Sequence, residues 1–329
     1  FFKQKTAYEI RNCDWSSDVC SSDLGFLGKA VVDTLEAKGY TNLLPIGSAV
    51  DLTCCEETLD FFKKEKPEVV LHLAATVGGI GANKDNPGLF MYNNLVMGSN
   101  TIEASRLNRV EKFVMVGTVC AYPKFTPVPF KEEDLWNGYP EETNAPYGIA
   151  KKALMQLVQS YHEQYDFNGV NLIPVNMYGP HDNFDPAISH VIPALILKFY
   201  KAIKFDLGSV EVWGTGEASR EFLHVYDCAN AISLGLENDV SPEPINIGTG
   251  GEIQIKYLAH TIAEVMGYNG AIYFNSAYPD GQPRRQLDIS RAQQRLGYEP
   301  QIDLLEGLEQ TVDSFMANKE QFDVYLNRI

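Results

Sequence analysis

The sequence has few basic residues for its length, with 27 Lys and Arg against 43 Asp and Glu and a formal net charge of −16. This balance excludes a broad basic field, so we expect no nucleic-acid partner. No apolar run approaches the roughly 20 residues that span a bilayer, and we expect no membrane segment. Six cysteines without zinc-type spacing predict neither a disulfide framework nor a metal site. A secretory signal, with a charged start and an apolar core, is also missing, so we expect a cytoplasmic protein.

What the chain does have is an ordinary globular composition, with 45% hydrophobic and 21% charged residues. Residues 1–24 nevertheless differ from the rest, because they lack helical or strand periodicity and crowd Ser and Asp at their end. They resemble the translation of a sequencing adapter fused to an open reading frame. We therefore expect residues 1–24 to be foreign sequence that replaces the first strand of the domain and its first glycine.

From Gly25 onward, strands and helices alternate. The expected strands are 43–46, 68–75, 112–117 and 170–175, and the expected helices are 25–38, 56–65, 89–107 and 146–166. Several of these strands are apolar throughout, which is typical of a parallel sheet that is covered by helices on both faces. The pattern predicts a Rossmann-type, doubly wound α/β domain over residues 25–176 that binds NAD or NADP.

The alternation loosens after residue 176. Helices are expected at 190–203, 227–237, 254–267, 290–296 and 303–317, with short strands near 210–213 and 245–247. We expect residues 177–329 to form a smaller α/β lobe that binds the substrate and is interleaved with the end of the first domain.

A glycine-rich turn opens the first of these helices. Dinucleotide sites use G-x-x-G-x-x-G so that the backbone can approach a pyrophosphate at a helix N-terminus. Gly25 and Gly28 fill the second and third positions, whereas Ser22 stands at the first. Two glycines at this spacing also suit a plain helix start, and the surrounding order of strands and helices favours the cofactor site.

A tyrosine and a lysine open the helix that follows the strand at 112–117. Tyr147 and Lys151 stand four residues apart and therefore share one helix face. An ammonium beside a phenol lowers the phenol pKa, so the tyrosine can act as an acid and base near neutral pH. Thr118, at the end of the strand, can bind the same substrate oxygen. We expect these three side chains to converge at the carboxyl edge of the sheet.

Several longer motifs complete the pattern. They are VGGIG at 77–81, GTVCAYPK at 117–124, NAPYGIAK at 144–151, YGPHDNF at 178–184, SHVIPA at 189–194, VWGTG at 212–216, SREFLH at 219–224 and PDGQPR at 279–284. With these motifs the chain resembles the extended short-chain dehydrogenases/reductases, a family of NAD-dependent epimerases and dehydratases. The resemblance is closest to the branch that converts GDP-4-keto-6-deoxy-D-mannose to GDP-L-fucose by C3/C5 epimerisation and NADPH-dependent reduction at C4.

The resemblance assigns catalytic roles to five residues. Thr118, Tyr147 and Lys151 correspond to the groups of the hydride step. Cys120 corresponds to the base of the epimerisation and His190 to its acid. This pair suits the chemistry, because the protons at C3 and C5 lie next to the C4 ketone and the free pKa values of Cys and His, about 8.5 and 6.5, lie near working pH.

Further residues are assigned to the two anionic ligands. The substrate contacts that the resemblance implies are Asn176, Lys198, Trp213, Arg220 and Arg285, with Arg285 at the GDP end. The expected cofactor contacts are Gly25, Gly28, Asp51, Leu52, Ala74, Ala75, Tyr147 and Lys151. A few placed cations can bind a GDP-sugar in an acidic protein by focusing the local field.

The identity of the cofactor follows from the resemblance alone. The family commonly holds the 2′-phosphate of NADP with arginines, and Gly47 and Leu24 stand at the corresponding places. We expect NADP, and NAD stays open. The family also leads us to expect a homodimer that pairs helices 89–107 and 146–166.

Other functions remain open at this point. The same fold serves 4-epimerases, reductases and 4,6-dehydratases, although a dehydratase has an acidic pair where Val119 and Cys120 follow Thr118. A different possibility is an inactive protein that binds sugar nucleotides without a cofactor, because the glycine loop is altered at Ser22.

Overall fold

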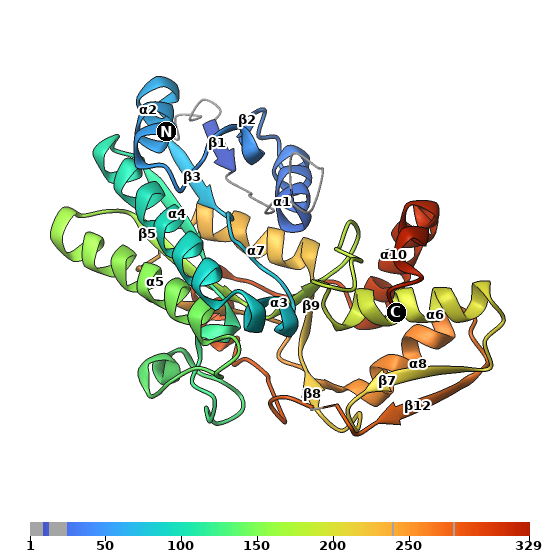
Figure 1. The fold of residues 1–329 in the computed structure, drawn as a ribbon. Coiled ribbons are helices and arrows are strands. Elements are labelled where there is room, and N and C mark those ends of the chain that lie inside the picture. Colours follow the sequence, from blue (N-terminus) through green and yellow to red (C-terminus); the bar gives the residue numbers. More distant parts are fainter. Residues whose placement is uncertain (1–8, 13–24, 239, 279) are drawn as a thin grey trace.

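A six-stranded sheet forms the centre of the computed structural model, which describes residues 9–12, 25–238, 240–278 and 280–329 (Figure 1). Its strands are β1 (Glu9–Asn12), β2 (Asn42–Pro45), β3 (Val69–His72), β4 (Lys112–Val116), β5 (Gly169–Pro174) and β10 (Ile245–Ile247). They lie in the order β10-β5-β4-β3-β1-β2, and every neighbouring pair is parallel. The predicted α/β fold class is confirmed. Within the described residues no helix is long and apolar enough to cross a bilayer.

Helices cover both faces of this sheet, which explains why its central strands are buried throughout. All residues of β3, β4 and β5 are buried. Helices α2 (Cys55–Glu65), α4 (Pro87–Leu107) and α5 (Ala145–Tyr165) cover one face (Figure 1). Helices α1 (Phe26–Ala37), α7 (Val225–Glu237) and α9 (Ser290–Leu296) cover the other. The helices predicted at 89–107 and 146–166 are confirmed as α4 and α5.

The first strand departs from the expectation. Residues Glu9–Asn12 pair with β2 on one side and with β3 on the other, although the sequence predicts no strand before α1. Strand pairing needs only backbone N–H and C=O groups. A segment that lies between β2 and β3 forms hydrogen bonds with the backbone groups along the edges of both strands. The sequence pattern reports side-chain burial, so it did not reveal this strand. Residues 1–8 and 13–24, with Ser22 and Leu24, lie outside the described residues.

The start of α1 lies beside the point where the strand order reverses. In the sheet, β1 lies between β2 on one side and β3 on the other, so the direction of the strand order reverses at β1. Sheets of this kind bind ligands in the crevice at the carboxyl ends of the strands where the order reverses. Gly25 caps α1 in an extended conformation, and Leu27, Val31 and Leu35 bury the helix against the core. Gly39, at φ +89°, follows the end of the helix.

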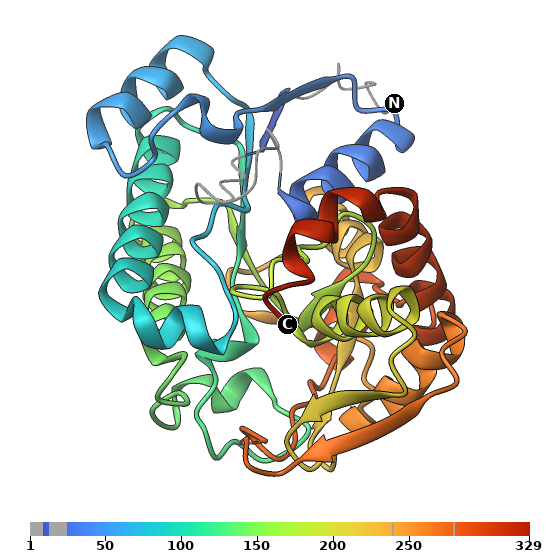
Figure 2. The ribbon, with the colours of Figure 1, turned by 45° about the vertical axis from the view of Figure 1, so that its right-hand side comes forward.

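A smaller set of elements packs around a second hydrophobic core (Figure 2). Its helices are α6 (Val191–Lys204), α8 (Ile255–Val265) and α10 (Leu304–Ala317). Its strands pair in twos, namely β7 (Ser209–Trp213) with β12 (Ala271–Asn275), β6 (Asn176–Tyr178) with β9 (Phe222–His224), and β8 (Ser219–Arg220) with β11 (Ile253–Gln254). The sequence missed β12, whose residues are exposed or half-buried and which becomes a strand through its pairing with β7.

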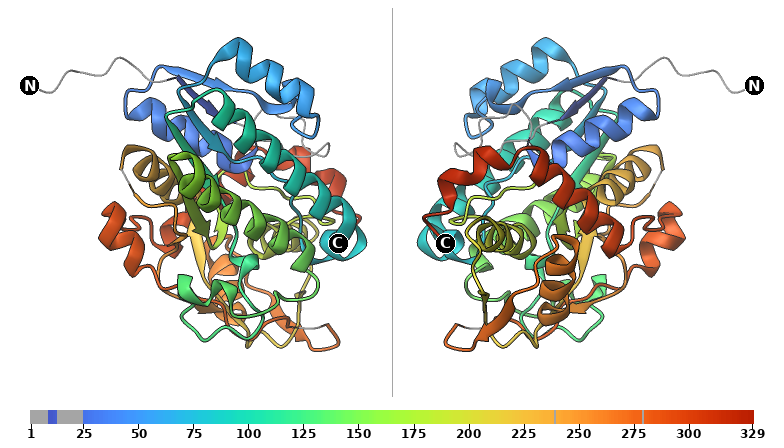
Figure 3. Two further views of the ribbon diagram at one scale, coloured as in Figure 1. Left: turned by 90° about the vertical axis from the view of Figure 1, so that its left-hand side faces the viewer. Right: turned by 90° about the vertical axis from the view of Figure 1, so that its right-hand side faces the viewer.

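Short elements complete the two parts. They are α3 (Ile80–Asp85) and the 3-10 turns η1 (Gly47–Ala49), η2 (Val119–Ala121), η3 (Glu132–Trp136) and η4 (Lys319–Tyr325). The chain leaves the sheet after β5, builds β6 and α6 in the smaller part, and returns through α7 and β10 (Figure 3). The interface between the two parts therefore lies at the carboxyl edge of the sheet, where β4 and β5 end.

Candidate active site

The first candidate group lies where β4 ends. Thr118 is buried and caps the turn η2 with an extended backbone, at φ −157° and ψ 143°. Its Oγ1 accepts a hydrogen bond of 3.2 Å from the backbone N–H of Cys120. This cap shapes the turn, and it sets Thr118 and the half-buried Cys120 on the same edge of the sheet.

The first turn of α5 lies directly against η2. A Cβ atom at Gly148 would overlap the backbone carbonyl of Cys120, so glycine permits the close approach of the two segments. One residue earlier, the phenol of Tyr147 lies close enough to Thr118 and Cys120 for both to act on its pKa. Three of the expected catalytic residues, Thr118, Cys120 and Tyr147, are therefore neighbours.

The pKa of Tyr147 is raised rather than lowered. Burial is the largest cause, the charge of Cys120 adds to it, and the hydrogen bond with Thr118 opposes both. Burial disfavours the phenolate because water no longer solvates it. The prediction that Lys151 brings the net pKa of Tyr147 down is wrong for this structure.

Lys151 is held by backbone carbonyls at the carboxyl ends of two strands. Its side chain is 1% exposed, and Nζ donates to the carbonyl of Val116 at 3.1 Å and to that of Ala74 at 3.4 Å. Ala74 is also one of the expected cofactor residues, and Ala75 beside it is half-buried. The lysine therefore ties α5 to the edge of the sheet where β3 and β4 end.

His190 stands at the N-terminus of α6, at the entrance to the smaller part. Its side chain keeps accessible surface, yet desolvation by the surrounding protein lowers its pKa. Across the described residues, no hydrogen bond joins His190 to Cys120, so the expected base and acid do not form a contacting pair.

The loop that carries His190 is fixed by the glycines before α3. The backbone N–H of Gly79 donates to the carbonyl of Ile188 at 2.9 Å. A Cβ atom at Gly79 would lie 3.0 Å from the carbonyl oxygen of Ser189, which is tighter than ordinary contact. The glycine motif at 77–81 thus supports the position of His190, a role that the sequence did not reveal.

Arg285, which is expected at the GDP end of the substrate, lies beside the thiol of Cys120. Its Nη1 donates to Sγ of Cys120 at 3.7 Å, and the guanidinium also donates twice to the side chain of Gln282. The two residues lie 165 positions apart, so only the tertiary fold brings the cation to the thiol.

Arg220 and Asn176 lie close to this cation. Arg220 is half-buried and donates to the carbonyls of Ser219 at 2.7 Å and Asp280 at 3.2 Å. Burial, and then the charge of Arg285, lower the pKa of Arg220 to about 10. Asn176 donates to the carbonyl of Glu221 at 3.4 Å. Arg220 and Arg285 therefore place positive charge beside the turn η2 that carries Cys120.

Lys198 and Trp213 form a separate group with Tyr278. The ring of Trp213 is 59% exposed and stacks on Tyr278 with the ring centres 4.4 Å apart. Nζ of Lys198 lies 5.0 Å from the Trp213 ring and donates to the carbonyl of Glu211. Burial lowers the pKa of Lys198, and the charge of Glu211 opposes this change. A stacked aromatic pair with an adjacent cation can hold a base and a phosphate.

The expected cofactor residues differ in their surroundings. Gly25 and Gly28 are buried at the N-terminus of α1, which suits a pyrophosphate. Asp51 is exposed, and its carboxylate accepts hydrogen bonds from both the N–H and the hydroxyl of Thr53. Leu52 is completely buried and packs in a small core with Met97.

The sequence also missed Glu221, a completely buried carboxylate between Arg220 and Phe222. It accepts hydrogen bonds from the backbone N–H groups of Thr249 at 2.6 Å, Gly250 at 2.8 Å and Leu287 at 2.6 Å. Burial raises its pKa and these N–H groups oppose the rise. The only sequence signal was an acidic residue beside an apolar strand.

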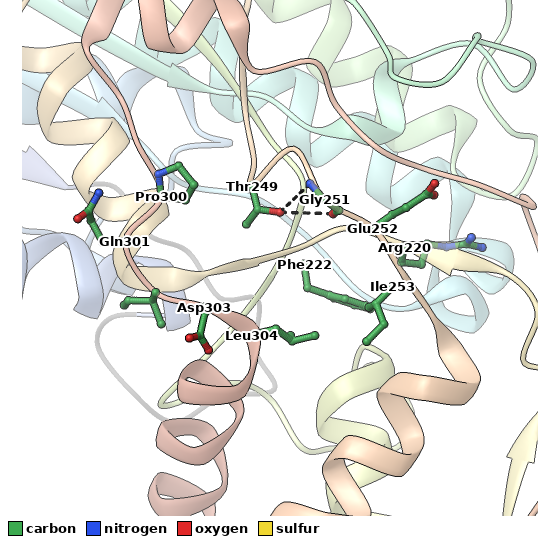
Figure 4. Close-up of a pocket in the computed structure, with 11 residues that line it drawn as sticks. Arg220, Phe222, Thr249, Gly251, Glu252, Ile253, Pro300, Gln301, Asp303 and Leu304 are labelled. Carbon is green, nitrogen blue, oxygen red and sulfur yellow. Dashed lines mark hydrogen bonds between the residues drawn. The ribbon is translucent and has the colours of Figure 1, made fainter.

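A pocket of about 370 Å³ lies next to Glu221 (Figure 4). Its walls carry charged residues and apolar ones, namely Arg220, Phe222, Thr249, Gly251, Glu252, Ile253, Pro300, Gln301, Ile302, Asp303 and Leu304. Thr249 and Gly251 are joined across its rim by hydrogen bonds of 3.3 and 3.4 Å. Arg220 is the one expected site residue in this lining.

Known proteins share both this sequence and this fold. The GDP-L-fucose synthase of Sinorhizobium fredii (strain NBRC 101917 / NGR234) is 42% identical over 294 residues, 89% of this chain and 93% of the relative. That of Escherichia coli (strain K12) is 41% identical over 308 residues, 91% and 96% of the two chains. A solved GDP-L-fucose synthetase from Naegleria fowleri bound to NADP matches with a TM-score of 0.87 at 27% identity and covers 96% of this chain and 95% of that chain.

A family model extends the comparison beyond individual relatives. The model of the NAD dependent epimerase/dehydratase family matches residues 24–248, which is more than half of the chain. The matched stretch includes β3, β4, β5 and all five expected catalytic residues. The chain belongs to the NAD dependent epimerase/dehydratase family.

Proposed function

We propose that this chain converts GDP-4-keto-6-deoxy-D-mannose to GDP-L-fucose by epimerisation at C3 and C5 followed by reduction at C4 with NADPH. The observation that carries this proposal is the contact of Thr118 and Tyr147 with the turn that holds Cys120. A simple reductase or 4-epimerase needs no thiol at that place. Relatives at 41 and 42% identity are GDP-L-fucose synthases, and a structural neighbour binds NADP.

The glycine turn at α1 fits a dinucleotide. Gly25 is buried, its backbone is extended, and it caps a helix N-terminus at the carboxyl edge of the sheet beside the switch in strand order. Backbone N–H groups and the helix dipole favour a pyrophosphate there. When bound, NADPH supplies the hydride for C4.

Tyr147 acts as the acid of the reduction. Its raised pKa keeps the phenol protonated at neutral pH, so the hydroxyl can give a proton to O4 of the sugar as the carbonyl is reduced. Thr118 hydrogen-bonds the same oxygen. Lys151 holds α5 on the carbonyls of Ala74 and Val116 and thereby sets the position of Tyr147 one turn earlier.

Cys120 and His190 carry the epimerisation. The thiolate of Cys120 takes the proton from C3 or C5, the C–H electron pair forms a C=C bond, and the carbonyl electrons move to O4. The imidazolium of His190 then returns a proton to the opposite face, and the electron pairs move back. Desolvation lowers the pKa of His190, so the imidazolium is a stronger acid while a smaller share of the ring carries the proton at neutral pH.

We also propose that the protein is a cytoplasmic homodimer that uses α4 and α5. These helices lie side by side on one face of the molecule (Figure 3, left). Large apolar side chains on them are exposed, namely Leu89 (52%), Tyr92 (62%) and Tyr165 (45%). Exposed apolar side chains on both helices favour a protein partner there.

The whole reaction is tested by product analysis. Incubation with GDP-4-keto-6-deoxy-D-mannose and NADPH in D₂O is expected to give GDP-L-fucose with deuterium at C3 and C5, detected by NMR. NADH in a parallel reaction is expected to react more slowly. A product reduced at C4 without deuterium at C3 and C5 would identify a simple reductase, and the absence of any product would refute the proposal.

Two substitutions should separate the two steps. Tyr147→Phe removes the acid of the reduction, so NADPH oxidation should fall about 100-fold or more while deuterium exchange without NADPH persists. Cys120→Ser removes the base, and exchange should fall by more than NADPH oxidation does. An equal loss of both activities in Cys120→Ser contradicts the assignment of Cys120 as the base.

Gly79→Ala should impair epimerisation through the position of His190. The added Cβ meets the carbonyl of Ser189, so the loop before His190 must shift by a few tenths of an ångström. We expect C3/C5 exchange to slow about 3- to 10-fold, since small displacements of catalytic groups are costly. Gly81→Ala is the matched control, because its Cβ meets nothing within 4 Å. Equal exchange rates in the two variants speak against the support of His190 by Gly79.

Light scattering tests the dimer. The expected mass is about twice 36.7 kDa. Leu89→Lys should shift the mass toward the monomer, because it places a charge in the proposed interface. Phe125→Lys, at a residue that is 87% exposed on the loop before η3, serves as the control and should remain dimeric. A monomeric mass for the unsubstituted chain contradicts the proposal.

A further inference from the structure

A guanidinium lies against the thiol that the proposed function assigns as the base. Nη1 of Arg285 is 3.7 Å from Sγ of Cys120, within the range of a hydrogen bond to sulfur. Both side chains are half-buried, so water screens their interaction less than it would at an open surface. The resemblance implies a contact of Arg285 with the GDP end of the substrate and gives it no task beside the thiol.

Two sets of hydrogen bonds hold Arg285 in this position. Its Nε and Nη2 donate to Oε1 of Gln282 at 3.3 and 3.0 Å, and Gln282 in turn donates to the carbonyl of Lys124 at 2.8 Å. Its backbone carbonyl accepts from the N–H of Glu221 at 3.1 Å. A side chain that is already ordered loses little entropy when it stabilises a neighbouring charge.

Arg285 also differs from the other cations near the site. Arg284 forms an ion pair with Glu252 and is exposed. Arg220 donates to two backbone carbonyls. Within the part of the chain that the structure describes, no carboxylate lies within ion-pair distance of Arg285. Its charge is therefore available to a neighbouring anion.

We infer that Arg285 holds Cys120 in its thiolate form and so prepares the base for proton removal at C3 and C5. The thiol proton leaves to water, and the guanidinium stabilises the sulfur anion by its charge and by the N–H···S bond. This inference rests on the proposed function for its purpose. It assigns Arg285 to the epimerisation step rather than to the GDP end of the substrate.

The other groups near Cys120 are consistent with this role. Tyr147, from α5, faces the sulfur and has a raised pKa, so it stays neutral and does not repel the thiolate. Lys151, one turn further along α5, donates to the carbonyls of Ala74 and Val116. Thr118, from the same turn as Cys120, is uncharged at all relevant pH values. Arg285 is therefore the charged group in direct contact with the sulfur.

The test measures the alkylation of Cys120 by iodoacetamide as a function of pH, followed by mass spectrometry of the peptide that contains Cys120. Iodoacetamide reacts with the thiolate, so the midpoint of the rate profile reports its formation. In Arg285→Gln the midpoint should move up by about one pH unit, which corresponds to about tenfold slower alkylation at neutral pH. Arg285→Lys keeps the charge and should recover most of the rate.

Two further variants complete the design. Arg284→Gln is the matched control on the adjacent residue, and its profile should equal that of the unsubstituted chain. Gln282→Ala releases the guanidinium but keeps its charge, and it should move the midpoint in the same direction by a smaller amount. This variant keeps the inference testable if Arg285→Gln does not fold. Identical profiles for the unsubstituted chain and the Gln282 or Arg285 variants would overturn the inference.

A second readout separates this role from substrate binding. C3/C5 exchange in Arg285→Gln should fall in proportion to the thiolate at each pH and recover as the pH rises, whereas the Kd for GDP from calorimetry should stay within about twofold. A large loss of GDP affinity with an unchanged alkylation profile would contradict the inference and would indicate that Arg285 binds the GDP end of the substrate. Alkylation needs neither substrate nor cofactor, so it can succeed or fail independently of the proposed reaction.

Discussion

An ammonium group inside a protein must find hydrogen-bond acceptors, because no water is there to solvate it. Lys151 meets this need with the carbonyls of Ala74 and Val116, at the carboxyl ends of two adjacent parallel strands. The carbonyls of parallel strands point outward only at that edge, so the lysine docks the start of α5 there. The positions of Tyr147 against Thr118 and of Gly148 against Cys120 follow from this docking.

A second buried charge organises the other side of the site. Glu221 collects backbone N–H groups from Thr249, Gly250 and Leu287, and its own N–H binds the carbonyl of Arg285. A buried carboxylate is stable when several N–H groups satisfy it. In a protein with a net charge of −16, positive groups reach an anionic substrate by such local placement rather than through the overall field.

Much of this arrangement could be predicted from local pattern. The apolar strands, the helices at 89–107 and 146–166, and the Tyr147–Lys151 spacing depend on residues close in sequence. The errors share a different origin. The strand Glu9–Asn12 depends on backbone pairing with two remote strands, and the raised pKa of Tyr147 depends on burial.

The sequence by itself determined the α/β class and the family, and it named the candidate reactive groups, because hydrophobic periodicity and short motifs are local properties of the chain. Only the tertiary structure decided which groups touch. It brought Arg285 to Cys120 across 165 positions, and it set the His190 loop on Gly79. Contacts of this kind arise where the ends of separate strands and loops meet at one edge of the sheet, and they depend on distances and burial that no stretch of sequence contains.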